Sequence, residues 1–207
     1  MRFANMSSWQ IGVSADDTLP VFALWLRDIE AIAVPPAGLV PGPLDCGELP
    51  PPSGEPHEPG LGEEWLAWWL SLVDRRPRRR PLSPPDDDAE PAHDTPDPLG
   101  LARLPVLRGH VSRRWTEFLH WRTAWHRAAG TYVDRRRPGD NRTGEVVREV
   151  ERALGRRAAP FHLRFVLLPV RDDRILQVEA DHYLVPERVY WSAGWPAWLR
   201  TVVERVA

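Results

Sequence analysis

Proline limits what this chain of 207 residues can fold into, because many of its 23 prolines fall in two segments that cannot form a regular helix or a central strand. Residues 35–61 combine prolines with glycines, so we expect an extended surface loop from which Leu39, Val40 and Leu44 reach the core. Residues 77–98 are basic and then acidic with almost no apolar content, which predicts a disordered loop. The whole chain, residues 1–207, is predicted to form a single globular domain that includes these two loops.

The 11 tryptophans fall mostly on amphipathic helical patterns. Trp65, Trp68 and Trp69 recur with Leu72 and Val73 at the spacing of one helix face. We interpret this face as core, because aromatic platforms that stack bases or sugars are displayed among polar residues. The same period predicts four further helices, over residues 18–34, 110–130, 143–157 and 195–206.

Each of these helices has a predicted inner and outer face. In residues 18–34, Arg27 and Glu30 fall opposite the apolar face, and in residues 110–130 Trp121 falls at its margin. The inward residues of the 110–130 helix are predicted to be Val111, Trp115, Phe118, Leu119, Trp125 and Ala129. Those of the 143–157 helix are predicted to be Val146, Val150, Ala153 and Leu154.

Alternating segments near the C-terminus predict a β-hairpin over residues 161–185. A two-residue turn at Asp172 and Asp173 would give one apolar face, which also carries His182, and would set Arg164 opposite Asp181 on the other face. That polar face would comprise His162, Arg164, Glu179, Asp181 and Tyr183. With a short strand at residues 7–13, we predict an α+β fold: four to five amphipathic helices packed on a small antiparallel sheet with the C-terminal β-hairpin (161–185) and a C-terminal helix (195–206).

The composition excludes several chemistries. All 27 basic residues are arginine, and a chain without lysine can form neither a Schiff base nor a P-loop of the Walker type. Cys46 is the single cysteine, so an internal disulfide, a redox pair and a cysteine-rich metal site are excluded. No motif in the sequence indicates a metal or a cofactor, and a net charge of -2 makes nucleic acid an unlikely partner.

The sequence also bears on location and origin. The longest apolar runs are six residues, against the roughly 20 that a membrane-spanning helix needs, and the first residues lack the apolar core of a secretory signal. We therefore expect a cytoplasmic protein without a membrane partner. The abundance of arginine, alanine, proline and glycine indicates a GC-rich bacterial genome.

Two groups of titratable side chains could support catalysis. The first lies on the outer face of the 110–130 helix and consists of Arg113, Glu117, His120 and Arg127. A carboxylate near a histidine can orient it as a general base, and arginines can hold a phosphate. The second, on the polar hairpin face, includes His162, Arg164 and Asp181. The alternative for the first group is a solvated helix face with ion pairs that have no catalytic role. The alternative for the second group is a solvent-facing sheet with cross-strand pairs.

The densest charge lies in a predicted loop, at Arg75, Arg76, Arg78, Arg79 and Arg80. Arginine forks suit carboxylate or phosphate groups, and the acidic residues 86–90 could compete for them within the chain. We predict a non-catalytic intracellular accessory protein that binds another protein through this segment. The alternatives are a metal-free, lysine-independent hydrolase or nuclease that uses His, Glu and Arg, or a small-molecule binder with a Trp-lined pocket.

Overall fold

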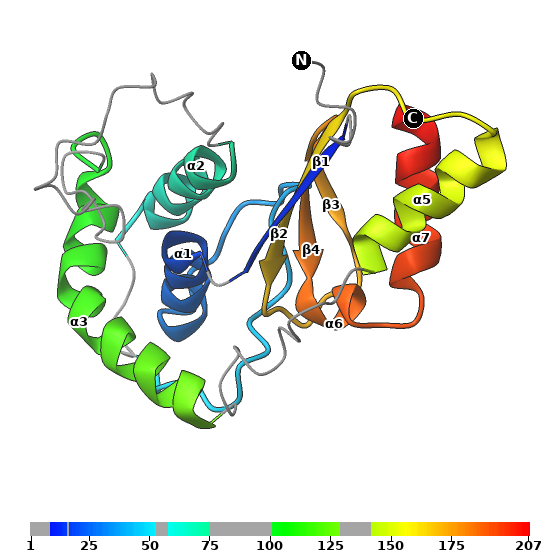
Figure 1. Cartoon of the computed structure of the whole chain (residues 1–207). Helices are drawn as coiled ribbons and strands as arrows, with labels where there is room; N and C mark the ends of the chain where they lie inside the picture. The colour runs from blue at the N-terminus through cyan, green and yellow to red at the C-terminus, as the bar shows by residue number, and fades with distance from the viewer. Residues whose placement is uncertain (1–8, 16, 53–57, 75–100, 129–141) are drawn as a thin grey trace, which may run out of the picture. The chain divides into compact units, whose positions relative to one another are not determined.

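The structure, a computed structural model, describes residues 9–15, 17–52, 58–74, 101–128 and 142–207 (Figure 1). Within these ranges the chain forms six helices and a four-stranded mixed sheet, so the predicted α+β class is confirmed. The chain divides into two compact units, a helical unit of residues 16–125 and a sheet unit of residues 1–15 and 126–207. The single domain expected over residues 1–207 stays a prediction.

The helical unit contains α1 (Thr18–Ile29), α2 (Leu61–Val73) and α3 (Pro105–Ala128), of which the last three residues are assigned to the sheet unit. Helix α1 is apolar on every side from Val21 to Leu26, and all of these residues are fully buried, as expected of an enclosed helix. It ends before the predicted limit at residue 34, because Ala31 adopts a left-handed φ of 51° and the N–H of Ile32 donates back to the Arg27 carbonyl at 2.9 Å.

Helix α2 confirms that the tryptophan stripe is core. Trp65 and Trp69 are fully buried, and Trp68 is 6% exposed. The indole N–H of Trp65 donates to the Ala23 carbonyl at 2.8 Å, and that of Trp69 donates to the Leu39 carbonyl at 2.9 Å. These tryptophans therefore hold α2 against both α1 and the proline-rich loop.

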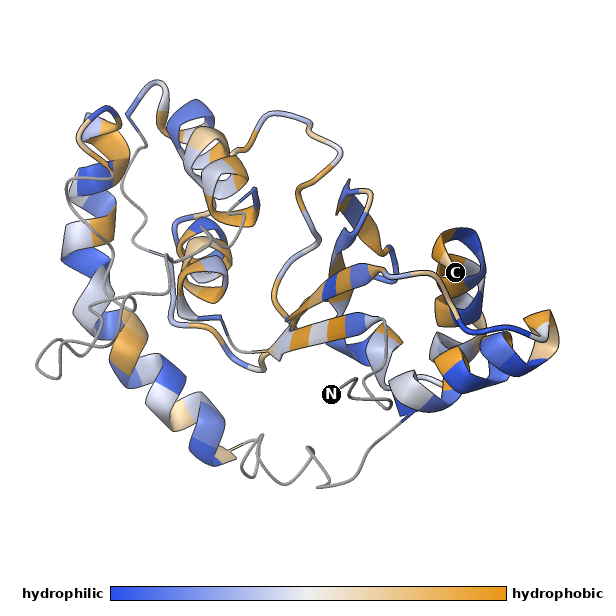
Figure 2. Ribbon diagram, turned by 45° about the horizontal axis from the view of Figure 1, so that its top comes forward, coloured by the Kyte–Doolittle hydropathy of each residue, from blue (hydrophilic) through white to orange (hydrophobic). Residues whose placement is uncertain are grey.

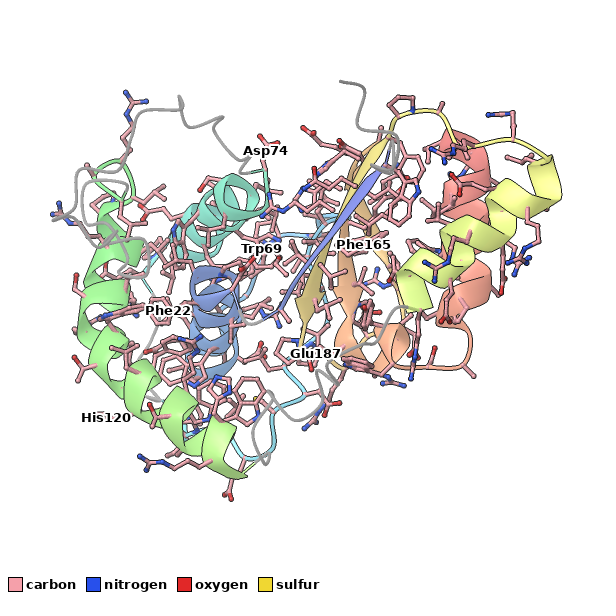
Figure 3. The ribbon with its side chains drawn as sticks, in the orientation of Figure 1. Phe22, Trp69, Asp74, His120, Phe165 and Glu187 are labelled. Atoms are coloured by element: carbon pink, nitrogen blue, oxygen red, sulfur yellow. The ribbon has the colours of Figure 1, made fainter. Side chains whose placement is uncertain are left out.

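Phe22 is at the centre of the aromatic core, between α1 and α3 (Figure 3). Its ring contacts those of Trp25, Trp68, Trp115 and Phe118, with centroids between 4.8 and 6.1 Å apart. Aromatic pairs at such distances add to the stabilisation from burial alone.

The predicted inner face of α3 is correct for Val111 and Phe118 but wrong for Leu119, which is 38% exposed. The buried face is rotated by roughly 60° from the prediction at 100° per residue. It runs through His110 toward Trp121, whose ring contacts Trp25 at 5.9 Å. The prediction weighted every apolar residue equally and so placed the face too close to Leu119.

The described part of the proline-rich loop is fastened to α1. The Arg27 guanidinium donates to the carbonyls of Pro41 and Gly42 at 2.8 and 2.9 Å, and Asp28 accepts the Leu44 N–H at 2.7 Å. Leu44 is buried, as predicted, whereas Leu39 and Val40 are only half-buried. Arg27 is only 9% exposed, so its predicted place on the outer face is wrong. The proline-rich loop covers the side of α1 that carries Arg27, and the buried guanidinium of Arg27 donates hydrogen bonds to the loop carbonyls.

The sheet unit has the strands β1 (Gln10–Ala15), β2 (His162–Leu168), β3 (Leu176–Glu179) and β4 (His182–Pro186). Their order is β1-β2-β4-β3, in which β1 and β4 both run parallel to β2 and only β3 is antiparallel to its neighbour. The sheet is therefore mixed, not purely antiparallel. The hairpin present is β3–β4, which turns at Ala180 and Asp181, and not the predicted hairpin over 161–185.

The predicted register between the last strands is also wrong. Arg164 pairs with His182 and Phe165 with Tyr183, so His182 shares the face of Arg164 and Tyr183 lies on the apolar face. The cause is the connection after β2: the Asp172 carboxylate accepts the Arg174 N–H at 2.9 Å within a longer loop and does not form a two-residue turn. The run from Phe165 to Leu168 is buried throughout, which is typical of a parallel central strand.

One face of the sheet packs against α5 (Arg142–Leu154) and α7 (Trp195–Val206), and the short α6 (Glu187–Tyr190) follows β4. Hydrophobic and hydrophilic residues alternate along α5 in Figure 2. The predicted bounds of the C-terminal helix are confirmed. In α5, Val146 and Val150 are buried as predicted, but Val147 is buried in place of Ala153 and Leu154, and Leu154 is 44% exposed.

Among the described helices, none is long and apolar enough to cross a membrane.

Candidate functional site

A charged cluster joins α1 to α3 in the helical unit. Arg114 donates from Nε to a Glu30 carboxylate oxygen at 2.5 Å and from Nη1 to Glu117 at 2.6 Å. The Nδ1 atom of His110 lies 3.9 Å from the same Glu30 oxygen. Glu30 and His110 are 4% and 8% exposed, whereas the side chains of Arg114 and Glu117 are 22% and 39% exposed, so the cluster is buried at Glu30 and open to solvent at Glu117.

Helix geometry explains how these residues meet. His110, Arg114 and Glu117 recur at four- and three-residue spacing on the side of α3 that contacts α1. Glu30 is the C-cap of α1, where the helix dipole disfavours a negative charge and a neighbouring cation compensates. Burial lowers the pKa of the Arg114 guanidinium, but the hydrogen bonds and charges of Glu30 and Glu117 outweigh it, so the pKa is raised overall.

Glu30 was predicted on the outer face of its helix, and that prediction is wrong. The signal that could have placed it is the run of six apolar residues from Val21 to Leu26, which leaves α1 no solvent face. A helix enclosed on all sides encloses its charged residues as well, and these then need partners.

The structure does not bring the four catalytic candidates of α3 together. Glu117 is held by Arg114, whereas Arg113 and His120 are exposed, and His120 lies on the side of α3 away from Phe22 (Figure 3). Arg127 is exposed as well. A general base and its orienting carboxylate must lie within hydrogen-bonding reach, and no contact of this kind links Glu117 to His120 among the described interactions.

A second polar group crosses the sheet unit from strand to strand. Gly12 of β1 pairs with Arg164 of β2, Arg164 pairs with His182 of β4, and His182 pairs with Glu179 of β3. Residues directly opposite one another project from the same face, so this row places Arg164, His182 and Glu179 side by side. His182 is 8% exposed, and a β-bulge between Gln177 and Glu179 sets the register at this end.

His162 and Asp181 border this row. The Nδ1 atom of His162 lies 3.9 Å from Asp181 Oδ2, and the Arg164 N–H donates to the Asp181 carbonyl at 2.7 Å. The side chains of His162 and Asp181 are 47% and 54% exposed. The second set of sequence-predicted candidates, His162, Arg164 and Asp181, is therefore brought together, although by a parallel pairing that the sequence did not indicate.

Tyr183, which was predicted to belong to this polar face, lies on the opposite one. Its hydroxyl donates to the Ala180 carbonyl at 3.1 Å, and its ring packs on Phe165 and Trp198. Burial raises the pKa of Tyr183, against the charge of Arg205, which lowers it. Tyr183 is therefore a core residue and not a member of the site.

The five arginines predicted to bind a partner, Arg75, Arg76, Arg78, Arg79 and Arg80, lie outside the described residues, as does the charged loop at 77–98. In the ranges that the structure describes, no three His, Cys, Asp or Glu side chains gather as a metal site would require. Comparison with known protein families, with curated proteins and with solved structures finds no match to this chain.

Proposed function

We propose that the protein works by binding a partner protein and not by catalysis, as an intracellular accessory protein of a GC-rich bacterium. The observation that supports this most is the state of Glu117, the carboxylate of the candidate site on α3. Arg114 engages it together with the buried Glu30, so the cluster ties α3 to α1. Because Glu117 is engaged in an ion pair with Arg114 and no described contact links it to His120, this group suits a structural role.

The proposed contact is the arginine segment that follows α2. Helix α2 ends at Val73, and the five arginines begin two residues later. Five guanidinium groups within six positions can bind a carboxylate-rich surface of a partner protein. The attraction must be local to this segment, because the whole chain carries a net charge of -2.

Affinity capture from the native host tests this proposal. We expect the tagged full chain to retain a specific protein, and the change of the five arginines to serine to release it without a change in melting temperature. The control replaces the same number of exposed arginines in the sheet unit: Arg148, Arg152, Arg157, Arg188 and Arg205. Equal capture by both variants would contradict the role of residues 75–80.

A second candidate function, a metal-free hydrolase or nuclease, is favoured by the His162–Asp181 pair. A carboxylate near Nδ1 can orient an imidazole so that its other nitrogen accepts a proton from water. Arg164, next along the same face, offers a positive charge for an anionic substrate. Hydrolysis of phosphodiester and carboxylester substrates should then be measurable and should be lost in His162→Gln, with Arg148→Gln on α5 as the control.

A further inference from the structure

Helix α3 is basic in a chain that is slightly acidic overall. Between Pro105 and Trp125 it carries four arginines and one glutamate, whereas the chain has a net charge of -2. The glutamate, Glu117, and one arginine, Arg114, are engaged with each other toward α1. The charge that remains on the outer side of α3 is therefore positive, and Figure 2 shows hydrophilic residues along the length of this helix.

The outer side of α3 also has a regular pattern. Its exposed seam follows alternating steps of three and four residues and consists of Gly109, Ser112, Thr116, Leu119 and Thr123. The buried or half-buried positions of the helix, such as His110, Phe118 and Trp121, fall on the opposite side. Alternating steps of three and four are the spacing with which one helix packs along another.

Basic side chains flank this seam on both sides. Arg113 and His120 lie seven residues apart on one flank, and Arg108 and Arg122 lie on the other, with Trp115 between them. Seven residues correspond to about 10.5 Å along a helix. In paired helices these flanking positions carry the charges that select the partner. Arg108, Arg113 and His120 are exposed, and so is the apolar Leu119 at the centre of the seam.

We propose that this surface docks an acidic α-helix of a partner protein. The inference rests on the proposed partner-binding function and adds to it a second contact, on α3, separate from the one at residues 75–80. Small seam residues such as Gly109 and Thr116 let a second helix approach closely, and glutamates on that helix would meet the basic flanks. Nucleic acid fits less well, since the exposed basic residues beside the seam, Arg108, Arg113 and His120, fall short of the roughly six to ten phosphate contacts that give strong, salt-dependent DNA binding.

The test is binding of the full-length protein to a labelled synthetic peptide of about four heptads, with alanine at the seam and glutamate at the flanking positions. We expect salt-dependent binding that weakens about tenfold in the double variant Arg108→Glu and Arg113→Glu, because each favourable ion pair becomes a repulsive one. The matched control is Arg148→Glu with Arg152→Glu, two exposed arginines on α5, and it should bind as the parent does. Circular dichroism should show that both variants stay folded.

The proposal would be overturned by no binding to the parent protein, by equal binding to the two double variants, or by stronger, Arg113-dependent binding of a DNA duplex than of the peptide. The variant with serine at the five arginines of residues 75–80 separates this proposal from the previous one. It should bind the peptide normally even where it fails to capture a partner from the host. Loss of peptide binding in that variant alone would move the contact away from α3.

Discussion

The helical unit and the sheet unit place their polar groups differently. Of the described residues, the helical unit buries Thr18, Arg27, Glu30 and His110, whereas the sheet unit buries one polar side chain of this kind, His182. The sheet unit instead leaves His162 and Asp181 about half exposed at the edge of its polar row.

The difference follows from how each unit provides hydrogen-bond partners for its backbone N–H and C=O groups. In the sheet unit, neighbouring strands pair the main-chain groups, and the core between sheet and helices can be apolar. In the helical unit, a proline-rich segment passes over α1 without such a ladder. Its carbonyls accept hydrogen bonds from the side chains of Arg27 and Trp69, so buried polar groups replace the missing strand neighbours.

The largest effect that we expect concerns the aromatic core of the helical unit. Trp68→Ala should lower the free energy of unfolding by roughly 3–5 kcal/mol, the usual cost of deleting a large buried aromatic side chain. Trp121→Ala should cost clearly less, because Trp121 is only half buried although it contacts Trp25. Denaturant unfolding measures both, and equal losses would contradict this ranking of the two positions.

Next in size is the loss of the buried charge at Glu30. Glu30→Ala should lower the free energy of unfolding by about 2–4 kcal/mol, because the partly buried guanidinium of Arg114 would lose its main partner. If the cluster is structural, a double-mutant cycle with Arg114→Ala should show strong coupling between the two residues. Independent effects would mean that the ion pair does not tie α3 to α1.

Sequence reasoning succeeded where one face of an element was both apolar and regular. The stripe of α2 and the bounds of the C-terminal helix followed from spacing alone, since one face of each packs on a core. Reasoning of the same kind placed Leu119 inside and Arg27 outside, because a periodic pattern does not indicate which other segment folds over a helix.

The strand pairing failed for a related reason. His162, Arg164 and Asp181 were expected on one polar face, and they do lie close together, but His182 and Tyr183 exchanged faces. Adjacent alternating segments favour a hairpin by proximity, whereas β2 instead pairs with the second strand that follows it. A shift of the strand register by one residue moves every side chain of the strand to the opposite face of the sheet. The segments that form strands were therefore predicted correctly, but the residues expected on the polar face were partly wrong.

A smaller effect contrasts two glycines of the helical unit. A Cβ at Gly62 would lie 2.1 Å from the backbone oxygen of Ala33, whereas a Cβ at Gly109 would meet nothing within 4 Å. Gly109→Ala should stabilise by roughly 0.5–1 kcal/mol through helix propensity, and Gly62→Ala should destabilise despite the same gain. Thermal melts of the two variants should shift in opposite directions. A stabilised Gly62→Ala would show that α2 does not approach the backbone at Ala33 this closely.

The smallest effect concerns the exposed pair of the sheet unit. His162→Gln and Asp181→Asn should each change the free energy of unfolding by less than about 1 kcal/mol, because solvent screens an ion pair whose side chains are half exposed. The contrast with Glu30 sharpens the comparison of the two units, since both positions carry a carboxylate 3.9 Å from a histidine and differ in burial. If Asp181→Asn destabilised as strongly as Glu30→Ala, the polar row would be as structural as the α1–α3 cluster. With a small effect, the His162–Asp181 pair is free to serve hydrolysis, and the substrate assay with His162→Gln then decides whether it does.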